Sequence, residues 1–144
     1  MTFQGYVVDA SVVIQRLVKE PHTEHVRRLM RNLAEQDRLW VSDFCLLEIT
    51  NVIWKQVRFG NLDQERAVFM AQRIIPLLPL QVYRADGDLL AEALRIGLAQ
   101  ELTVYDSVYI AMAARLDCPL ISVDVGQNRA AEAHGIHLKS STDF

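Results

Sequence analysis

Short apolar runs alternate with helix-patterned segments along the chain, and this alternation restricts the possible folds more than any other feature. Each apolar run has the length and the β-branched or aromatic content of a buried strand, and a segment with helical periodicity separates it from the next. Strands connected through helices pair in parallel, and helices then cover both faces of the sheet. We therefore predict a three-layer α/β/α, Rossmann-like fold with a central parallel five-stranded sheet. The strands are expected at residues 5–9, 38–42, 80–84, 119–123 and 136–140.

Start and stop signals delimit the helical segments between these strands. Asp63 precedes one helix, and Gly60 ends the long helix before it. Ser42 or Asp43 is expected to cap that long helix at its amino end, and Asp86 to Asp88 should cap a later one. The helices are expected over residues 10–19, 22–36, 44–59, 64–75, 89–100, 102–116 and 128–135.

Length and composition predict a single domain over residues 1–144. With 144 residues and 51% hydrophobic content, the chain can bury a core without disulfides, since a domain of this size buries roughly 70% of its unfolded surface. Cys45 and Cys118 lack metal-site spacing, and we expect both to be reduced core residues of a cytoplasmic protein. Neither a leader sequence nor the roughly 20-residue apolar run of a membrane span is expected.

The charge balance does not identify a partner. A net charge of −3 offers no general attraction to nucleic acid. However, 12 of the 15 basic residues are Arg, whose guanidinium suits forked contacts with phosphate groups.

Three apolar segments lead into an aspartate. These are "YVVDASVVI" with Asp9, "LTVYDSVYIAMAARL" with Asp106 and "LISVDVG" with Asp124. In open parallel sheets, ligands bind at the carboxyl ends of the strands, where the strand order reverses. If the first and fourth strands are neighbours there, Asp9 and Asp124 converge. Asp106 joins them if its helix begins at the same edge.

Helical spacing adds a fourth acid to this group. Phe44, Glu48 and Val52 are four residues apart, so they share one stripe of the long helix, and the stripe is otherwise apolar. This pattern turns Glu48 toward the protein, where an unpartnered carboxylate is costly or becomes neutral. Asn51 can support Glu48 by hydrogen bonding, and a divalent cation shared with the other acids would stabilise all of them.

Each acid also has an ordinary structural interpretation. An aspartate at a helix start is usually an N-cap, which applies to Asp9 and Asp106; Asp124 can be a loop acid, and Glu48 a partly exposed helix residue. Their convergence favours a metal site, because carboxylates repel one another without a cation. Hard oxygen ligands select Mg²⁺ or Mn²⁺, and the four histidines are not arranged as a zinc site. Cations held by carboxylates support phosphodiester cleavage.

Four motifs in this order resemble the PIN domain family, and most closely its VapC-type toxin ribonucleases. An apolar strand followed by Asp-Ala-Ser matches residues 7–11, and a helical Glu with Asn three residues later matches Glu48 and Asn51. The Tyr-Asp-Ser-x-Tyr pattern matches residues 105–109, and a strand that ends in hydroxyl-x-Asp matches residues 122–124. The likeness extends from residue 6 to about residue 139.

The resemblance implies a Mg²⁺- or Mn²⁺-dependent endonuclease that acts on RNA, frequent homodimers and neutralisation by a cognate antitoxin protein. It implies catalytic and metal-binding roles for the four acids and supporting roles for three polar residues. Two departures stand out, because Ser122 replaces the usual Thr and an apolar Val125 follows the fourth acid. The acids are Asp9, Glu48, Asp106 and Asp124, and the supporting residues are Ser11, Asn51 and Ser122.

Two alternatives remain open. One is a non-catalytic PIN-like module that binds RNA or protein, although such a module should have lost at least one of the four acids, which are all present. The other is an RNA-processing nuclease that is not a toxin; the short length of the chain favours the toxin. Receiver domains and haloacid-dehalogenase-like phosphatases need a second acid near Asp9 that this chain lacks. The RNA target is not predicted, and Arg16 and Arg129 are candidates for RNA contacts.

Overall fold

The computed structural model of the chain describes residues 5–15, 17–18, 23–34 and 39–140. It contains a five-stranded sheet in the order β3-β2-β1-β4-β5, and every neighbouring pair is parallel. The predicted α/β class, the parallel sheet and its five strands are confirmed. The strands are β1 (Tyr6–Val8), β2 (Leu39–Ser42), β3 (Gln81–Tyr83), β4 (Leu120–Ile121) and β5 (Leu138–Lys139).

Strand β1 lies at the centre of the sheet, between β2 and β4. Val7 pairs with Trp40 on one side and with Leu120 on the other. From β1 the strand order runs to β2 and β3 in one direction and to β4 and β5 in the other, so the β1–β4 junction is the switch point. The first and fourth strands are thus neighbours, which is the condition under which Asp9 and Asp124 were expected to converge.

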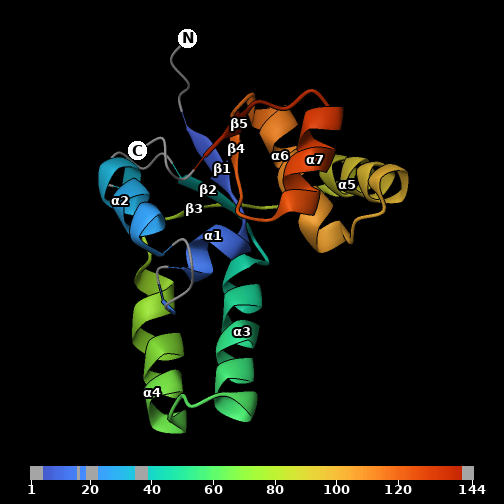
Figure 1. Ribbon diagram of the computed structural model, residues 1–144. Helices are drawn as coiled ribbons and strands as arrows, with labels where there is room; N and C mark the ends of the chain where they lie inside the picture. The colour runs from blue at the N-terminus through green and yellow to red at the C-terminus, as the bar shows by residue number, and fades with distance from the viewer. Residues whose placement is uncertain (1–4, 16, 19–22, 35–38, 141–144) are drawn as a thin grey trace.

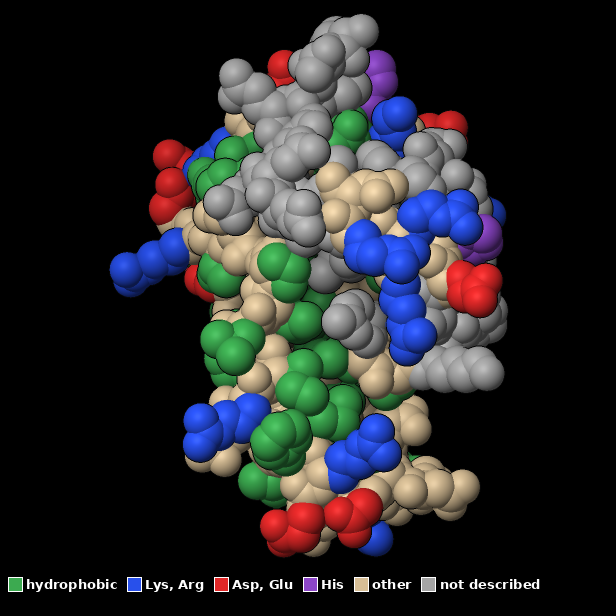
Figure 2. Space-filling view, turned by 90° about the vertical axis from the view of Figure 1, so that its left-hand side faces the viewer, with side chains coloured by type: hydrophobic (Ala, Val, Ile, Leu, Met, Phe, Trp, Pro, Cys, Tyr) green, Lys and Arg blue, Asp and Glu red, His purple; other side chains and the backbone are tan. Residues whose placement is uncertain are grey.

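The helices form two groups, one on each side of the sheet (Figure 1). Helices α5, α6 and α7 lie together on one side and α1 to α4 on the other, while α3 and α4 extend away from the sheet as a two-helix arm. The surface of the arm carries many hydrophobic side chains (Figure 2). The helices are α1 (Ala10–Ile14), α2 (Thr23–Ala34), α3 (Cys45–Phe59), α4 (Gln64–Phe69), the π-helix η1 (Met70–Ile74), the 3₁₀-helix η2 (Ile75–Leu77), α5 (Gly87–Gln100), α6 (Val104–Leu116) and α7 (Val125–Ala133).

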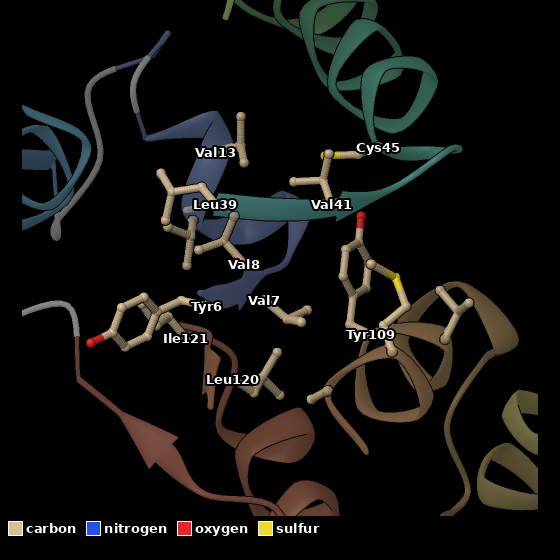
Figure 3. Packing of buried hydrophobic residues seen from close by; sticks show 14 of the residues in the cluster. Tyr6, Val7, Val8, Val13, Leu39, Val41, Cys45, Tyr109, Leu120 and Ile121 are labelled. Atoms are coloured by element: carbon tan, nitrogen blue, oxygen red, sulfur yellow. The ribbon is translucent and has the colours of Figure 1, made fainter. Parts of the chain in front are cut away.

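The core is built around the central strands, whose side chains meet residues from helices of both groups (Figure 3). Val7 and Val8 are fully buried, as expected for a strand that is covered on both faces. Val13 of α1, Cys45 of α3 and Tyr109 of α6 pack against this centre. Both Cys45 and Cys118 are free thiols and are buried, as predicted.

Several helix boundaries differ from the prediction. Helix α1 ends at Ile14 instead of residue 19, and the amides of Leu17 and Val18 both donate to the Ile14 carbonyl in a turn. The run of β-branched residues that ends at Ile14 is a poor helix former, which favours this early end. The helix expected over 64–75 is α-helical only to Phe69 and continues as a π-helix and a 3₁₀-helix. Helix α7 begins at Val125, three residues earlier than expected.

The predicted capping residues are partly correct. Asp63 and Asp86 cap α4 and α5 by accepting from the amides of Arg66 and Leu89, whereas Asp88 lies inside the first turn of α5. Neither Ser42 nor Asp43 is the N-cap of α3, so the capping role expected of one of them was wrong. The N-cap of α3 is Phe44, whose amide donates to Ser42 Oγ, while Asp43 accepts from the Ala85 amide.

Part of one predicted surface lies outside the described residues. The sequence of α2 has an amphipathic pattern that predicts one apolar face, and Val26 on this face is fully buried. The side chains of Leu29, Met30 and Leu33, which should complete that face, lie outside the described residues. Among the helices that the structure describes, none is long and apolar enough to cross a membrane.

Gly97 permits the close approach of α5 and α6, and this generates a prediction. A Cβ at Gly97 would lie 2.9 Å from the Leu102 carbonyl and 3.2 Å from Ser107 Oγ. Gly97→Ala should therefore lower the free energy of unfolding by about 1–3 kcal/mol, although Ala is the better helix former by about 1 kcal/mol. Urea unfolding followed by circular dichroism measures the change.

Gly87→Ala is the matched control, because nothing lies within 4 Å of a Cβ built there, in the first turn of the same helix. This variant should be neutral or more stable by about 0.4–1 kcal/mol. If both variants had the same stability, close packing at Gly97 would not be the reason for the glycine.

Candidate active site

Asp9 occupies the switch point and is the most buried acid of the candidate site. Its side chain is 3% exposed, although it follows β1 directly and caps α1. The Val12 amide donates to Oδ1 at 3.2 Å, and the hydroxyls of Ser11 and Ser122 donate to Oδ1 and Oδ2 at 2.5 Å. Burial raises the pKa of Asp9 to about 6, against the lowering effect of these hydrogen bonds. The capping role and the buried position therefore occur together.

Ser11 and Ser122 join the ends of β1 and β4 through Asp9. Each hydroxyl donates to the carboxylate and accepts a backbone amide from the β4 end, Ser11 from Val123 at 3.4 Å and Ser122 from Asp124 at 3.0 Å. With both carboxylate oxygens held in this way, the Asp9 side chain has little freedom to rotate.

Glu48 lies on α3 and is half-buried, with Tyr109 of α6 as its hydrogen-bond partner. The Tyr109 hydroxyl donates to Glu48 Oε1 at 3.2 Å and accepts from Ser42 Oγ at 3.3 Å. Burial is the main cause that raises the pKa of Glu48 to about 7; the Tyr109 bond opposes it, and the charges of Asp106 and Asp9 add to it. Glu48 thus points to the same edge as these two aspartates.

Glu48 turns toward the protein as expected, but the hydrogen bond expected from Asn51 is not found among the described residues. The stripe of α3 that faces the core is Cys45, Ile49 and Ile53. The stripe of Glu48 begins with the exposed Phe44, so it borders the core rather than entering it. Asn51 is exposed and makes no hydrogen bond to Glu48 in the described part of the chain. The support expected from Asn51 comes from Tyr109, which is 61 residues from Glu48 in the sequence.

Asp106 and Asp124 stand at the starts of two neighbouring helices. Asp106 lies in the first turn of α6 and is half-buried; burial raises its pKa, the charge of Asp124 adds to this, and a hydrogen bond with Thr103 opposes it. Asp124 is exposed and caps α7 by accepting from the Gln127 amide at 2.8 Å. The buried Gln127 side chain donates to the Asp106 carbonyl at 2.9 Å, which fastens the two helix starts together.

The sequence pattern did not indicate two of these contacts. Gln127 lies in the first turn of α7, but the sequence predicts that this helix begins at residue 128, so the position of Gln127 was not predicted. Tyr109 lies three residues after Asp106, on the same side of α6, and this spacing was the available signal.

The four predicted acids interact with one another electrostatically at this edge. The charge of Asp106 raises the pKa of Asp9 and of Glu48, and the charge of Asp124 raises that of Asp106. Like charges in proximity disfavour ionisation, so the metal-free site holds its negative charge at an energetic cost. A cation at this edge would remove that cost.

The donor set fits Mg²⁺ or Mn²⁺ in its chemistry. The group consists of carboxylates with hydroxyl support, and hard oxygen donors are the ligands these ions prefer. Within the described residues, no three His, Cys, Asp or Glu side chains stand close enough together to enclose one ion as they are. Binding would thus require movement of the half-buried Glu48 and Asp106 side chains, since Asp9 is held by its hydrogen bonds.

An open cleft of about 790 Å³ gives access to Glu48 from solvent. Helices α1, α3 and α6 form its walls, which are largely apolar and include Ile14, Phe44, Leu47, Trp54 and Tyr105. Ser11 and Asn51 also line the cleft, so one of the polar residues that hold Asp9 faces the same space. Of the two arginines considered for RNA contacts, Arg129 is exposed on α7, and Arg16 lies outside the described residues.

Comparisons with known proteins identify the family of the chain. The model of the PIN domain family matches residues 6–133. Ribonuclease VapC3 of Pyrobaculum aerophilum is 28% identical over 118 residues, which are 82% of this chain and 88% of that protein.

Solved structures share the fold. The DNA-bound VapBC complex of Salmonella typhimurium contains a chain that superposes with a TM-score of 0.70 at 18% identity, covering 96% of this chain and 99% of that one. VapC20 of Mycobacterium tuberculosis, a toxin that cleaves the sarcin-ricin loop, superposes with a TM-score of 0.66 at 17% identity, covering 88% and 95%.

The contact between Tyr109 and Glu48 generates a prediction. Tyr109→Phe removes the hydroxyl and leaves the buried ring, so the pKa of Glu48 should rise above about 7. The loss of the two hydrogen bonds of this hydroxyl, to Glu48 and from Ser42, should also lower the free energy of unfolding by about 1–3 kcal/mol. A ¹³C-NMR titration of the side-chain carboxyl groups in EDTA measures the pKa.

Tyr105→Phe serves as the control, because Tyr105 is 60% exposed and lies in the same helix. Removal of the Tyr105 hydroxyl should leave the pKa of Glu48 unchanged. An unchanged titration in Tyr109→Phe would mean that the two side chains do not interact in solution.

The raised pKa of Asp9 generates a prediction about stability and pH. Folding raises this pKa from 3.8 to about 6, so the folded protein binds more protons than the unfolded chain between these values. Stability in EDTA should therefore fall as the pH rises through this window, by up to about 3 kcal/mol from Asp9. Urea unfolding at a series of pH values measures the slope.

Asp9→Asn should flatten the slope, whatever its effect on absolute stability. Asp63→Asn is the control, since Asp63 is an exposed cap and Asn caps as well as Asp. Equal slopes in wild type and Asp9→Asn would show that the Asp9 carboxylate is not perturbed.

Proposed function

The chain belongs to the PIN domain family, and from this premise we propose that it is a Mg²⁺- or Mn²⁺-dependent endoribonuclease and the toxin of a toxin–antitoxin pair. The observation that carries the proposal is the buried Asp9 carboxylate, held by two hydroxyls at the switch point, with three further acids around it. The similarity to Ribonuclease VapC3 supports the choice of RNA as the substrate.

The proposed roles follow from the position of each acid. Asp9 is the fixed ligand, because its orientation is set by Ser11 and Ser122. Glu48 and Asp106 are the adjustable ligands, and the exposed Asp124 completes the acidic edge. When bound, the divalent cation would activate water and stabilise the negative charge that develops on the phosphate and on the leaving oxygen.

Proton binding and metal binding compete at these carboxylates. The pKa values of about 6 for Asp9 and about 7 for Glu48 mean that both retain protons in mildly acidic solution. A carboxylate must lose its proton before it binds a metal. Metal affinity, and with it the proposed cleavage, should therefore increase as the pH rises through this range.

The proposed protein partners follow from the relatives and from the exposed apolar surface. Solved structures with the same fold include complexes named VapBC, from Salmonella typhimurium and Rickettsia felis. On this chain, the apolar side chains of Phe44, Leu47 and Trp54 are exposed along the cleft. We propose that a cognate antitoxin covers such surface in the cytoplasm, and that the chain forms a homodimer.

The central prediction of this proposal concerns cleavage. Wild-type protein should cleave a fluorescent single-stranded RNA in Mg²⁺ or Mn²⁺ and should be inactive in EDTA. Asp9→Asn should reduce the rate by at least about a hundredfold, the scale of losing a few kcal/mol of transition-state stabilisation. Glu48→Gln and Asp106→Asn should act in the same direction, because each removes one negative ligand without changing the size of the side chain.

Two controls separate catalysis from folding and contamination. Asp63→Asn removes an acid remote from the site and should cleave like wild type. The metal alone should raise the melting temperature of wild type more than that of Asp9→Asn, since a ligand that binds the folded state stabilises it. Equal cleavage by wild type and Asp9→Asn, or cleavage in EDTA, would contradict the mechanism.

A further inference from the structure

We infer that Arg27, Arg31 and Arg73 form a second contact site for RNA, which binds phosphates of the substrate at a distance from the carboxylates. The inference rests on the proposed function, because it assigns the place where the same RNA is held. Arg27 and Arg31 lie on α2, and Arg73 lies on η1, the π-helix that continues α4.

The three arginines surround one hollow of about 370 Å³ between α2 and the segment that leads into β3. The other described residues that line it are apolar, namely Ile74, Leu77, Leu78 and Pro79, so its described lining contains no acidic residue. Lys and Arg side chains gather on the face that α2 contributes (Figure 2). We call this hollow the arginine hollow.

The arginines of the hollow have no acidic partners within the part of the chain that the structure describes. Other arginines do, since Arg95 pairs with Glu92 at 3.2 Å and Arg115 pairs with Asp86 at 2.8 Å. Arg27 and Arg31 are four residues apart on one helix face, where two like charges cost about 0.2–0.5 kcal/mol. A group of unpaired cations in a protein with a net charge of −3 indicates an anionic ligand.

The π-helix is an independent observation that points to the same place. Met70 is buried, and in an α-helix the residue four positions later, Ile74, would share its face. Instead, the Ile75 amide donates to the Met70 carbonyl five residues back, and Ile75 takes the buried position. Ile74 is thereby turned outward into the arginine hollow beside Arg73. Single π-turns within helices are rare and occur frequently at functional sites.

The composition of the arginine hollow fits RNA. Guanidinium groups form forked hydrogen bonds with phosphate oxygens, and the exposed Ile74 and Leu77 offer an apolar surface to a ribose or a base. The segment that carries Arg73 leads into the amino end of β3, whereas the acids stand at the carboxyl ends of the strands. The hollow therefore contributes to binding of the RNA and takes no part in the chemical step.

The test compares two triple variants that change the net charge equally. Arg27, Arg31 and Arg73 are replaced by Gln in one variant, and the exposed Arg58, Arg66 and Arg95 in the other. Both are made in the full chain with Asp9→Asn, so that RNA is not cleaved, and binding of a fluorescein-labelled single-stranded RNA is followed by anisotropy in EDTA at several salt concentrations.

The arginine-hollow variant should bind RNA at least about tenfold more weakly than the control variant. Its plot of log affinity against log salt should be shallower by about two, because each phosphate contact on a single strand contributes roughly 0.7 to the slope. With Asp9 restored and Mg²⁺ present, the KM of the arginine-hollow variant should rise while kcat stays unchanged, as for a loss of uniform binding.

Equal RNA affinities and equal salt slopes for the two triple variants would overturn the inference, even if the wild type cleaves RNA. If kcat of the arginine-hollow variant fell as much as its kcat/KM, the inference would also be overturned, because the hollow would then act in the chemical step. RNA binding that depends on the three arginines, in a protein that does not cleave RNA in Mg²⁺ or Mn²⁺, would support the hollow. That result would contradict the proposed nuclease function alone.

Discussion

The buried carboxylate of Asp9 is the group on which the rest of the structure depends. Burial opposes its charge, and the hydroxyls of Ser11 and Ser122 together with the Val12 amide offset part of that cost. Because Asp9 follows β1 and its partners come from α1 and the end of β4, satisfying one carboxylate also joins the central strands at their carboxyl ends. The hydrogen bonds that make the charge tolerable are thus the same bonds that fix its position.

Helix capping positions the acidic edge. Asp9 and Asp124 are N-caps of α1 and α7, and Asp106 lies in the first turn of α6. An N-cap accepts only one or two amides, so it retains oxygen lone pairs for another ligand. Caps that follow parallel strands face the same edge of the sheet, and the fold therefore gathers carboxylates there through local interactions that are favourable individually. Burial is the main cause of the raised pKa values of Asp9, Glu48 and Asp106, and the repulsion between the gathered carboxylates adds to it.

The sequence was sufficient where local patterns decide the outcome and insufficient where distant segments decide it. Strand number, the parallel sheet and the caps at Asp63 and Asp86 follow from periodicity and capping chemistry. The hydrogen bond between Tyr109 and Glu48 joins residues far apart in the sequence, and the pattern offered the nearer Asn51 instead. The π-turn at η1 buries Ile75 in place of Ile74, a shift that helical periodicity does not encode.

An edge built from carboxylates repels the phosphates that the proposed enzyme must approach. Without a cation, the local charge therefore opposes RNA binding, and the net charge of −3 does not compensate for it. Two arrangements resolve this conflict at different places. A divalent cation neutralises the edge itself, while the arginines of a separate hollow, which have no acidic partner among the described residues, attract the RNA backbone. Their separation matters, because an arginine beside Asp9 or Glu48 would form an ion pair and occupy the oxygens that the metal needs. Because the two sites are separate, one small protein can have both an acidic centre and a basic contact site for the same RNA.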